Sequence, residues 1–561
     1  MEYRSIPVAA LSESPRDSRF AAQNDASPMT HKIADDTARS YSTAKAGAAA
    51  SSARRSIALF HVGIAGLFAT GCGEKAELPP ASETTVIELP EPNPANSGGS
   101  AEVIEPPDPV EGIDQSTSID AETAPLNADP ALQQDRPPFT QPVSRGADRR
   151  PVLNQAKLER AGLRHFKSRR LSMYTDSEAM SCRDIPAAAD ELFAALVEYF
   201  GPLPPARDGS DFQVTGYLID DQDTFERLGL IPVNLPPFLN GRHRGLQFWA
   251  YDQKADYYRA HLALHEATHC FMTCIRGTWG PSWYMEGMAE HFATHRRSLD
   301  GDREGEFDFG VMPARPDEFE EWGRINVIQD TVAEGRAIEI DELRRLPAEA
   351  FLKNDPYAWS WALCHFLATH PRYRDRFREL SPPALRTRLN QEFDRLFADD
   401  FREMNDEWRL FVRNLCYGYD TTRAAIDFSE GTTLSATQPR TVTIRADLGW
   451  QSSEIHVTAG ERYEIAADGQ FTLAQQPKPW VSEPQGITFQ YSAGRPLGRL
   501  IGTIRPDDAT AGGFGTDIIN LGRGQVLTAP RSGTLYFRLN DDWDKLSDNR
   551  GEVVVRVGNR S

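Results

Sequence analysis

Apolar side chains recur at changing intervals along the chain, and the intervals predict its elements. Helical periodicity at residues 155–171 and 186–200 is followed by strand-like runs at 212–219 and 245–250. Residues 257–272 contain neither glycine nor proline and predict one continuous helix. Charged helical segments continue beyond it. The middle of the chain therefore predicts a mixed α/β region followed by an all-α region.

Beyond residue 427 the pattern changes to short alternating runs separated by Gly, Asp and Pro clusters. The runs that predict strands are 441–444, 455–457, 463–465, 535–539 and 553–557. Many short strands with turn residues between them are typical of a β-sandwich. We therefore expect an all-β sandwich over residues 430–561.

The chain carries one apolar run that no globular element explains. Residues 56–70 have the length of a signal-peptide core, follow Arg54 and Arg55, and precede Gly71 and Cys72. Small residues that lead into a cysteine resemble a bacterial lipoprotein signal, in which the cysteine becomes lipidated. Residues 1–72 are thus expected to form an N-terminal extension and signal, which predicts an exported cell-envelope lipoprotein anchored to the membrane through Cys72. The alternative is an uncleaved membrane anchor, which also places the bulk of the chain outside the cytoplasm.

Residues 73–150 lack the composition of a folded domain. From Glu74 to Asp135 the chain has fourteen acidic residues, one basic residue and many prolines. Such a segment buries too little apolar surface to offset its ordering entropy, so we expect a disordered acidic linker. The whole chain of 561 residues has a formal net charge of -20, which argues against nucleic-acid binding.

Within the predicted helix at 257–272, two histidines and a glutamate stand at the spacing of a metal site. His265 and His269 are four residues apart, so both imidazoles project from one helix face and can share a tetrahedral Zn2+. Glu266 can reach a metal-bound water without displacing it, where a general base is needed. The pattern predicts zinc-dependent hydrolysis. The alternative is two partly exposed helix histidines without a metal.

A catalytic zinc needs a third protein ligand. Residues 283–292 read Trp-Tyr-Met-Glu-Gly-Met-Ala-Glu-His-Phe. A histidine motif followed by this sequence resembles the gluzincin metallopeptidases of the peptidase MA-like group and, more distantly, the M1 aminopeptidases. The resemblance implies that Glu286 is the third ligand. Glu290, one helical turn later, is the rival ligand or a residue that orients a ligand histidine.

A second patch is similar to the same families. Residues 356–367 resemble the helix beyond the ligand glutamate, where a tyrosine donates a hydrogen bond to the developing oxyanion; by position this is Tyr357. His291, His295 and His365 are the alternative donors. Residues 241–245 contain no acid that would bind a free amino terminus, so aminopeptidase specificity is not indicated.

The resemblance implies an α+β gluzincin-type catalytic domain over residues 151–425, with a mixed α/β lobe, a helical lobe and a cleft between them. We accordingly expect a zinc metallopeptidase that hydrolyses peptide bonds in a peptide or protein substrate.

The end of the chain resembles the bacterial galactophilic lectin. The similarity lies in residues 539–542 and 547–553, and implies that Asp541, Asp548 and Asn549 hold a Ca2+ that also binds sugar hydroxyls. Arg550 stands where the family has a small residue. The alternative is a polar loop that closes the sandwich without an ion. Two further functions therefore stay open, a catalytically inactive peptidase-like binding protein and a glycan-binding adhesin acting through the β domain.

Overall fold

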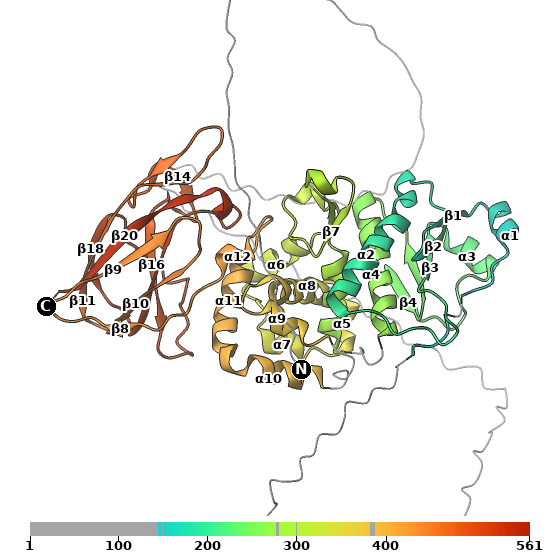
Figure 1. Cartoon of the computed structure of the whole chain (residues 1–561), viewed down its shortest axis with the longest axis horizontal. Coiled ribbons are helices and arrows are strands. Elements are labelled where there is room, and N and C mark those ends of the chain that lie inside the picture. The colour runs from blue at the N-terminus through green and yellow to red at the C-terminus, as the bar shows by residue number, and fades with distance from the viewer. Residues whose placement is uncertain (1–143, 149, 276–279, 299, 382–387, 561) are drawn as a thin grey trace, which may run out of the picture. The chain divides into compact units, whose positions relative to one another are not determined.

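The computed structural model describes residues 144–560 apart from residues 149, 276–279, 299 and 382–387 (Figure 1). The predicted signal with Cys72, and the predicted linker up to residue 143, lie outside these residues. Contacts divide the chain into two units, Met1–Pro125 and Leu126–Ser561, and the described residues all belong to the second. None of the described helices is both long enough and apolar enough to cross a membrane.

A five-stranded mixed sheet opens the described chain. Its strand order is β1 (Arg164–Lys167), β2 (Leu171–Thr175), β3 (Val214–Ile219), β5 (Gln247–Tyr251) and β4 (Gly241–Arg244). Strands β2, β3 and β5 run parallel, whereas β1 and β4 pair antiparallel at the two edges. Strand β4 is therefore an edge strand, and in the described part of the chain no other strand pairs with its outer side.

Both faces of this sheet are covered, since successive side chains of a strand point to opposite faces. Val214 and Leu218 of β3 join the large core that includes residues of α2 (Ile185–Phe200) and α4 (Asp256–Cys274). Tyr217 and Ile219 face a smaller core with residues of α1 (Gln155–Arg160) and α3 (Gln222–Leu228). In Figure 1 the sheet accordingly lies between these two pairs of helices.

The predicted helix at 155–171 is wrong beyond residue 160. Helix α1 ends at Arg160, and Gly162 follows with a φ of 91°, a conformation that favours glycine. The chain then turns into the antiparallel β1–β2 hairpin, where His165 stacks on Tyr174 at a ring-centroid distance of 4.2 Å. Cross-strand pairing, which no local periodicity reports, decides the structure here.

The other elements of the middle region follow the predictions closely. The helix expected at 186–200 is α2, the run at 212–219 contains β3, the run at 245–250 overlaps β5, and the site helix is α4. The later helices are α5 (Ser282–Ala293), α6 (Arg324–Ala333), α7 (Ile340–Arg344), α8 (Asn354–Thr369), α9 (Arg374–Arg378), α10 (Leu389–Phe397), α11 (Phe401–Asn414) and α12 (Thr421–Ala424). One correction applies, because β6 (His295–Arg297) and β7 (Phe307–Phe309) form a hairpin inside the region expected to be all-α.

Helices α5 and α8 approach each other very closely at Gly287. A Cβ atom at this position would lie 2.5 Å from the carbonyl oxygen of Ser360 and 2.5 Å from Sγ of Cys364. Only a glycine fits such a contact. The close packing fixes α5, which carries Glu286, against α8, which carries Tyr357.

Residues 432–559 form the expected all-β region, with strands but no α-helix among them. Its strands are β8 (Thr432–Thr433), β9 (Arg440–Arg445), β10 (Gln451–Val457), β11 (Arg462–Asp468), β12 (Phe471–Thr472), β13 (Val481–Ser482), β14 (Ile487–Ser492), β15 (Arg495–Leu497), β16 (Leu500–Pro506), β17 (Ile519–Asn520), β18 (Gly524–Thr528), β19 (Gly533–Leu539) and β20 (Arg550–Asn559). One sheet has the order β17-β16-β19-β10-β8 and the other β13-β12-β20-β11-β18 with β9 beside β20. Ile455 and Leu535 of the first sheet share a core with Val555 of the second, the packing of a β-sandwich.

Candidate metal centre

The centre begins on α4, which is buried over most of its length. His265, Glu266 and His269 are each at most 5 % exposed. The i, i+4 spacing brings both histidines to one helix face, as expected, and their Nε2 atoms lie 3.1 Å apart. Two imidazole nitrogens at this distance either share a proton or face a common ligand.

Helix α5 supplies the third candidate ligand atom. Oε2 of Glu286 lies 3.1 Å from Nε2 of His269 and 3.4 Å from Nε2 of His265. The three atoms form a nearly equilateral triangle, and a triangle of mutual contacts is poor hydrogen-bond geometry. Atoms that each lie 2.0–2.1 Å from a tetrahedral ion are about 3.3 Å apart. The nitrogen and oxygen donors, their number and their separations therefore fit one Zn2+.

Charge favours an ionised Glu286. Burial by itself raises the pKa of this carboxyl, but the charges and hydrogen bonds of His269 and His265 outweigh burial and lower the pKa below its usual range. A carboxylate that is ionised although it is buried is suited to bind a cation.

Glu290 takes a different place. Its Oε1 lies 3.4 Å from Nδ1 of His265, on the far side of the ring from the triangle, and its Oε2 lies 3.2 Å from Nε2 of His261. Arg324 donates from Nη2 to Oε1 at 3.0 Å and from Nε to Oε2 at 3.2 Å. Of the two acids, Glu286 thus contacts Nε2 of both histidines, whereas Glu290 faces the opposite edge of the His265 ring and is placed to orient it.

His261, His265 and Glu290 form a second group of metal-ligating types. Both oxygens of Glu290 are engaged by the buried guanidinium of Arg324. A cation placed there would be repelled by that charge, so the group is suited to support the ring of His265 rather than to bind an ion.

Glu266 faces open space beside the triangle. It lines a cavity of about 170 Å³ together with His265 and Tyr357, and its buried Oε2 has no hydrogen-bond partner among the described residues. Strand β4 passes directly against it, since a Cβ on Gly241 would lie 2.5 Å from Oε1 of Glu266. A buried carboxylate oxygen that accepts no hydrogen bond at a cavity is placed to accept a proton from a bound molecule.

Tyr357 lies at the same cavity. Its ring centroid is 6.3 Å from that of His265. Burial, with a contribution from the charge of Glu286, raises its pKa well above the usual range, so the phenol keeps its proton and can donate it in a hydrogen bond. The alternative donors lie elsewhere, because His291, His295 and His365 do not line this cavity.

Sequence reasoning missed His243 of β4. Its ring stacks on that of His269 with centroids 4.6 Å apart, and its Nδ1 lies 3.6 Å from Oε2 of Glu266. It also missed Arg324 and His261. For His261 a signal exists in the sequence, since it stands four residues before His265 on the same helix face.

The predicted calcium ligands lie in the loop between β19 and β20. Asn549 donates from Nδ2 to Oδ2 of Asp541 at 2.8 Å and to the carbonyl of Ala446 at 3.1 Å. Burial raises the pKa of Asp541 to about 6. Oδ1 of Asp548 and Oδ1 of Asn549 are both buried without a hydrogen-bond partner. Unpartnered buried oxygens fit a hard cation, although no hydrogen bond joins Asp548 to the other two side chains.

Comparisons with known proteins add little to this geometry. No protein-family model matches the chain. No curated protein matches it either. A solved structure described as "EclA N-terminal domain; PllA-like lectin" is similar over 21% of this chain and 95% of its own, at 22% sequence identity and a TM-score of 0.18. A TM-score of that size does not establish a shared fold, and the resemblance to gluzincins stays a prediction.

Proposed function

We propose that this chain is a gluzincin-type zinc metallopeptidase. The proposal is carried by one observation, the convergence of His265, His269 and Glu286 in a triangle of 3.1–3.4 Å sides beside the buried carboxylate of Glu266. The arrangement combines three ligands with an adjacent general base, which is what hydrolysis at a catalytic zinc requires.

Bound zinc would polarise the substrate carbonyl and lower the pKa of a water molecule to about 7. The residues of the chain complete the reaction. Glu266 accepts the proton of the attacking water and delivers it to the leaving amine. Tyr357 donates a hydrogen bond to the oxygen on which negative charge develops. Glu290 keeps the ring of His265 in position through both steps.

A peptide is the substrate that this cavity favours. The outer side of β4 has no partner strand among the described residues, and β4 passes directly beside Glu266. An exposed strand edge can pair with an extended peptide through backbone hydrogen bonds. Gly241 has no side chain, which lets the carboxylate of Glu266 lie directly against this strand.

The cellular place of this activity is proposed from the sequence alone. The apolar run at 56–70 before Cys72 supports an exported lipoprotein of the cell envelope, tethered by the acidic segment up to residue 143.

Cleavage of a mixed peptide library, followed by mass spectrometry, tests the proposal. The full chain loaded with zinc should cleave peptides, and Glu266→Gln should reduce the rate about 10²–10⁴-fold, as expected for loss of a general base. Tyr357→Phe should reduce it about 10²–10³-fold while zinc stays bound. Equal cleavage by Glu266→Gln would show that a contaminant acts, and absence of cleavage would favour the inactive binding protein.

A second candidate function belongs to the β-sandwich. The unpartnered oxygens of Asp548 and Asn549, and the buried Asp541 that Asn549 contacts, support a Ca2+ site in the loop between β19 and β20. If the adhesin alternative holds, the protein should be retained on a glycan surface with calcium and released by a chelator. Retention that is independent of calcium would contradict this use of the loop.

A further inference from the structure

A large cavity adjoins the metal centre along β4. It has a volume of about 760 Å³ and is lined by residues of β4, by Thr273 at the end of α4 and by the segment from Ser144 to Asp148. His243 belongs to its wall and stacks on His269, so the cavity opens directly beside the ligand triangle. A cavity of this size is large enough to take several side chains of a ligand.

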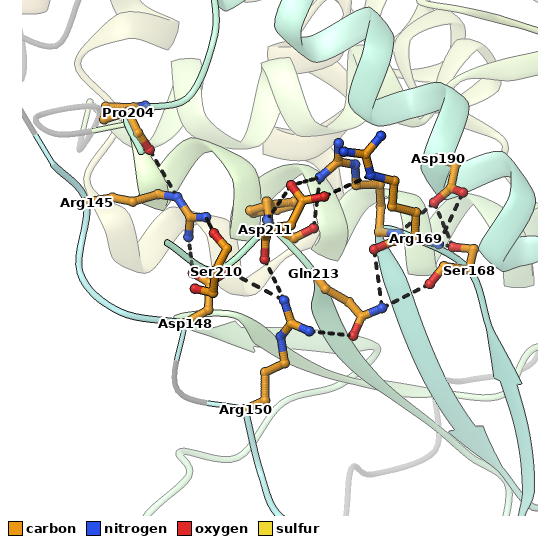
Figure 2. Close-up of polar contacts among 12 residues, drawn as sticks. Arg145, Asp148, Arg150, Ser168, Arg169, Asp190, Pro204, Ser210, Asp211 and Gln213 are labelled. Atoms are coloured by element: carbon orange, nitrogen blue, oxygen red, sulfur yellow. Dashed lines mark hydrogen bonds and ion pairs between the residues drawn. The ribbon is translucent and has the colours of Figure 1, made fainter. Parts of the chain in front are cut away.

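The outer wall is held by polar contacts. Figure 2 shows Arg145 donating from Nε to the carbonyl of Pro204 at 3.1 Å and from Nη2 to that of Ser210 at 2.9 Å, with an ion pair to Asp148. Asp148 is the acid in the wall, and Arg145 neutralises it. The segment is therefore a fixed part of the cavity, and its own charges cancel.

Three further arginines line the cavity without a counter-charge. Arg207 and Arg242 have no side-chain hydrogen bond or ion pair within the described ranges, and Arg244 donates only to the neutral Oδ1 of Asn234. We call the cavity with these three residues the arginine chamber. All three are exposed, so their charges face solvent or whatever enters the chamber.

The charge of the arginine chamber contrasts with that of the chain. The chain has a formal net charge of -20, yet the wall next to the metal centre carries three uncompensated positive charges. Uncompensated like charges around a concave site attract and hold ligands of opposite sign. Arg242 also lines the smaller cavity that contains Glu266, so this one residue borders both the chamber and the reacting groups.

We propose that the arginine chamber selects peptides that carry acidic residues on one side of the scissile bond. The inference rests on the proposed peptidase function and names its substrate class. The strand edge of β4 supplies the peptide specificity, because it can pair with a backbone. Arg207, Arg242 and Arg244 supply the preference for carboxylates. The arginines are specificity residues and take no part in the bond cleavage.

Binding of labelled peptides tests this without requiring cleavage. The full chain carrying Glu266→Gln is titrated with fluorescent twelve-residue peptides that hold three Asp or three Asn on either side of a central dipeptide. One of the two Asp peptides should bind at least ten-fold more tightly than its Asn counterpart at low salt, with an advantage that falls as salt is added. Arg207→Gln with Arg242→Gln should remove most of that advantage, since only Arg244 then remains of the three charges.

A double variant with the same change of charge provides the control. Arg160→Gln with Arg183→Gln, both exposed and outside the walls of either cavity, should keep the preference for Asp. Thermal unfolding confirms that each variant is folded.

Equal affinity for Asp and Asn peptides would overturn the proposal, and so would equal competition by inorganic polyphosphate, which has no peptide backbone. If the wild type cleaves peptides without a preference for Asp, the chamber proposal fails while the peptidase stands. If the Asp preference appears in binding but no peptide is cleaved, the chamber proposal stands and the peptidase proposal fails.

Discussion

The helix pair α4–α5 and the loop between β19 and β20 both gather possible metal ligands, but they hold them differently. On the helices, His265, His269 and Glu286 point at one another's ligand atoms across 3.1–3.4 Å. In the loop, Asn549 instead donates its amide to Asp541. Helix geometry thus brings the three candidate ligands together, whereas the loop is held by its own hydrogen bonds and would have to rearrange to bind an ion.

The largest expected effect concerns the support of the helical centre. Glu290→Gln keeps the shape of the side chain but removes the charge that faces Nδ1 of His265 at 3.4 Å. Loss of such an orienting partner weakens metal binding about 10–100-fold. Competition with a chelator measures the zinc affinity, with Asp548→Asn in the loop as the control that should leave it unchanged. An unchanged affinity in Glu290→Gln would mean that the centre does not depend on this support.

The region before the β-sandwich and the β-sandwich itself should also differ in how far acid destabilises them. Every buried histidine of the described chain precedes the β-sandwich. Burial lowers the pKa of His295 from 6.5 to about 4. The unfolded chain therefore takes up this proton first as pH falls, and the stabilisation present above pH 6.5 is lost between pH 6.5 and 4. From pH 7 to pH 5 this one group should lower the free energy of unfolding by about 2 kcal/mol.

The variant His295→Asn tests whether His295 lowers the free energy of unfolding as pH falls. The asparagine amide can replace Nδ1, which donates to the carbonyl of Ala293 at 2.8 Å, but it does not titrate. Urea unfolding at pH 7 and pH 5 should show about 2 kcal/mol less acid destabilisation in the variant than in the wild type. The same pH dependence in both proteins would contradict the assignment of a neutral buried His295.

The smallest effect is expected for the loop. Free calcium at ten times its dissociation constant should stabilise the chain by about 1.4 kcal/mol. Asp548→Asn should remove that stabilisation, since it takes away an unpartnered buried carboxylate oxygen. Thermal unfolding with calcium, and with magnesium as the control, measures the effect. Stabilisation that persists in Asp548→Asn would place the calcium elsewhere.

The sequence predicts the helical centre well because its geometry is local. The interval between His265 and His269 follows from one helix, and Glu286 follows on the next helix with a fixed length of chain between them. Long helices such as α2 and α4 and the strands β19 and β20 are likewise visible in periodicity. The resemblance supplied Glu286, and the structure brings that residue to both histidines.

The site residues and elements that the sequence did not predict depend on contacts between segments that are far apart in the chain. His243 reaches His269 only because β4 pairs with β5 at the sheet edge beside α4. Arg324 meets Glu290 across a loop and a hairpin. The β1–β2 hairpin overrides helical periodicity after Gly162. Pairing between strands and burial of charges are properties of the folded chain, and no spacing in the sequence encodes them.

The metal content of the purified full chain tests the central claim most directly. Elemental mass spectrometry after growth in zinc-replete medium should find about one zinc per chain in the wild type and in Glu266→Gln, and almost none in His269→Ala or Glu286→Ala. Such a result would establish the three ligands and leave Glu266 as a residue that acts without binding the ion. A wild type without zinc, or zinc retained in either His269→Ala or Glu286→Ala, would contradict the account.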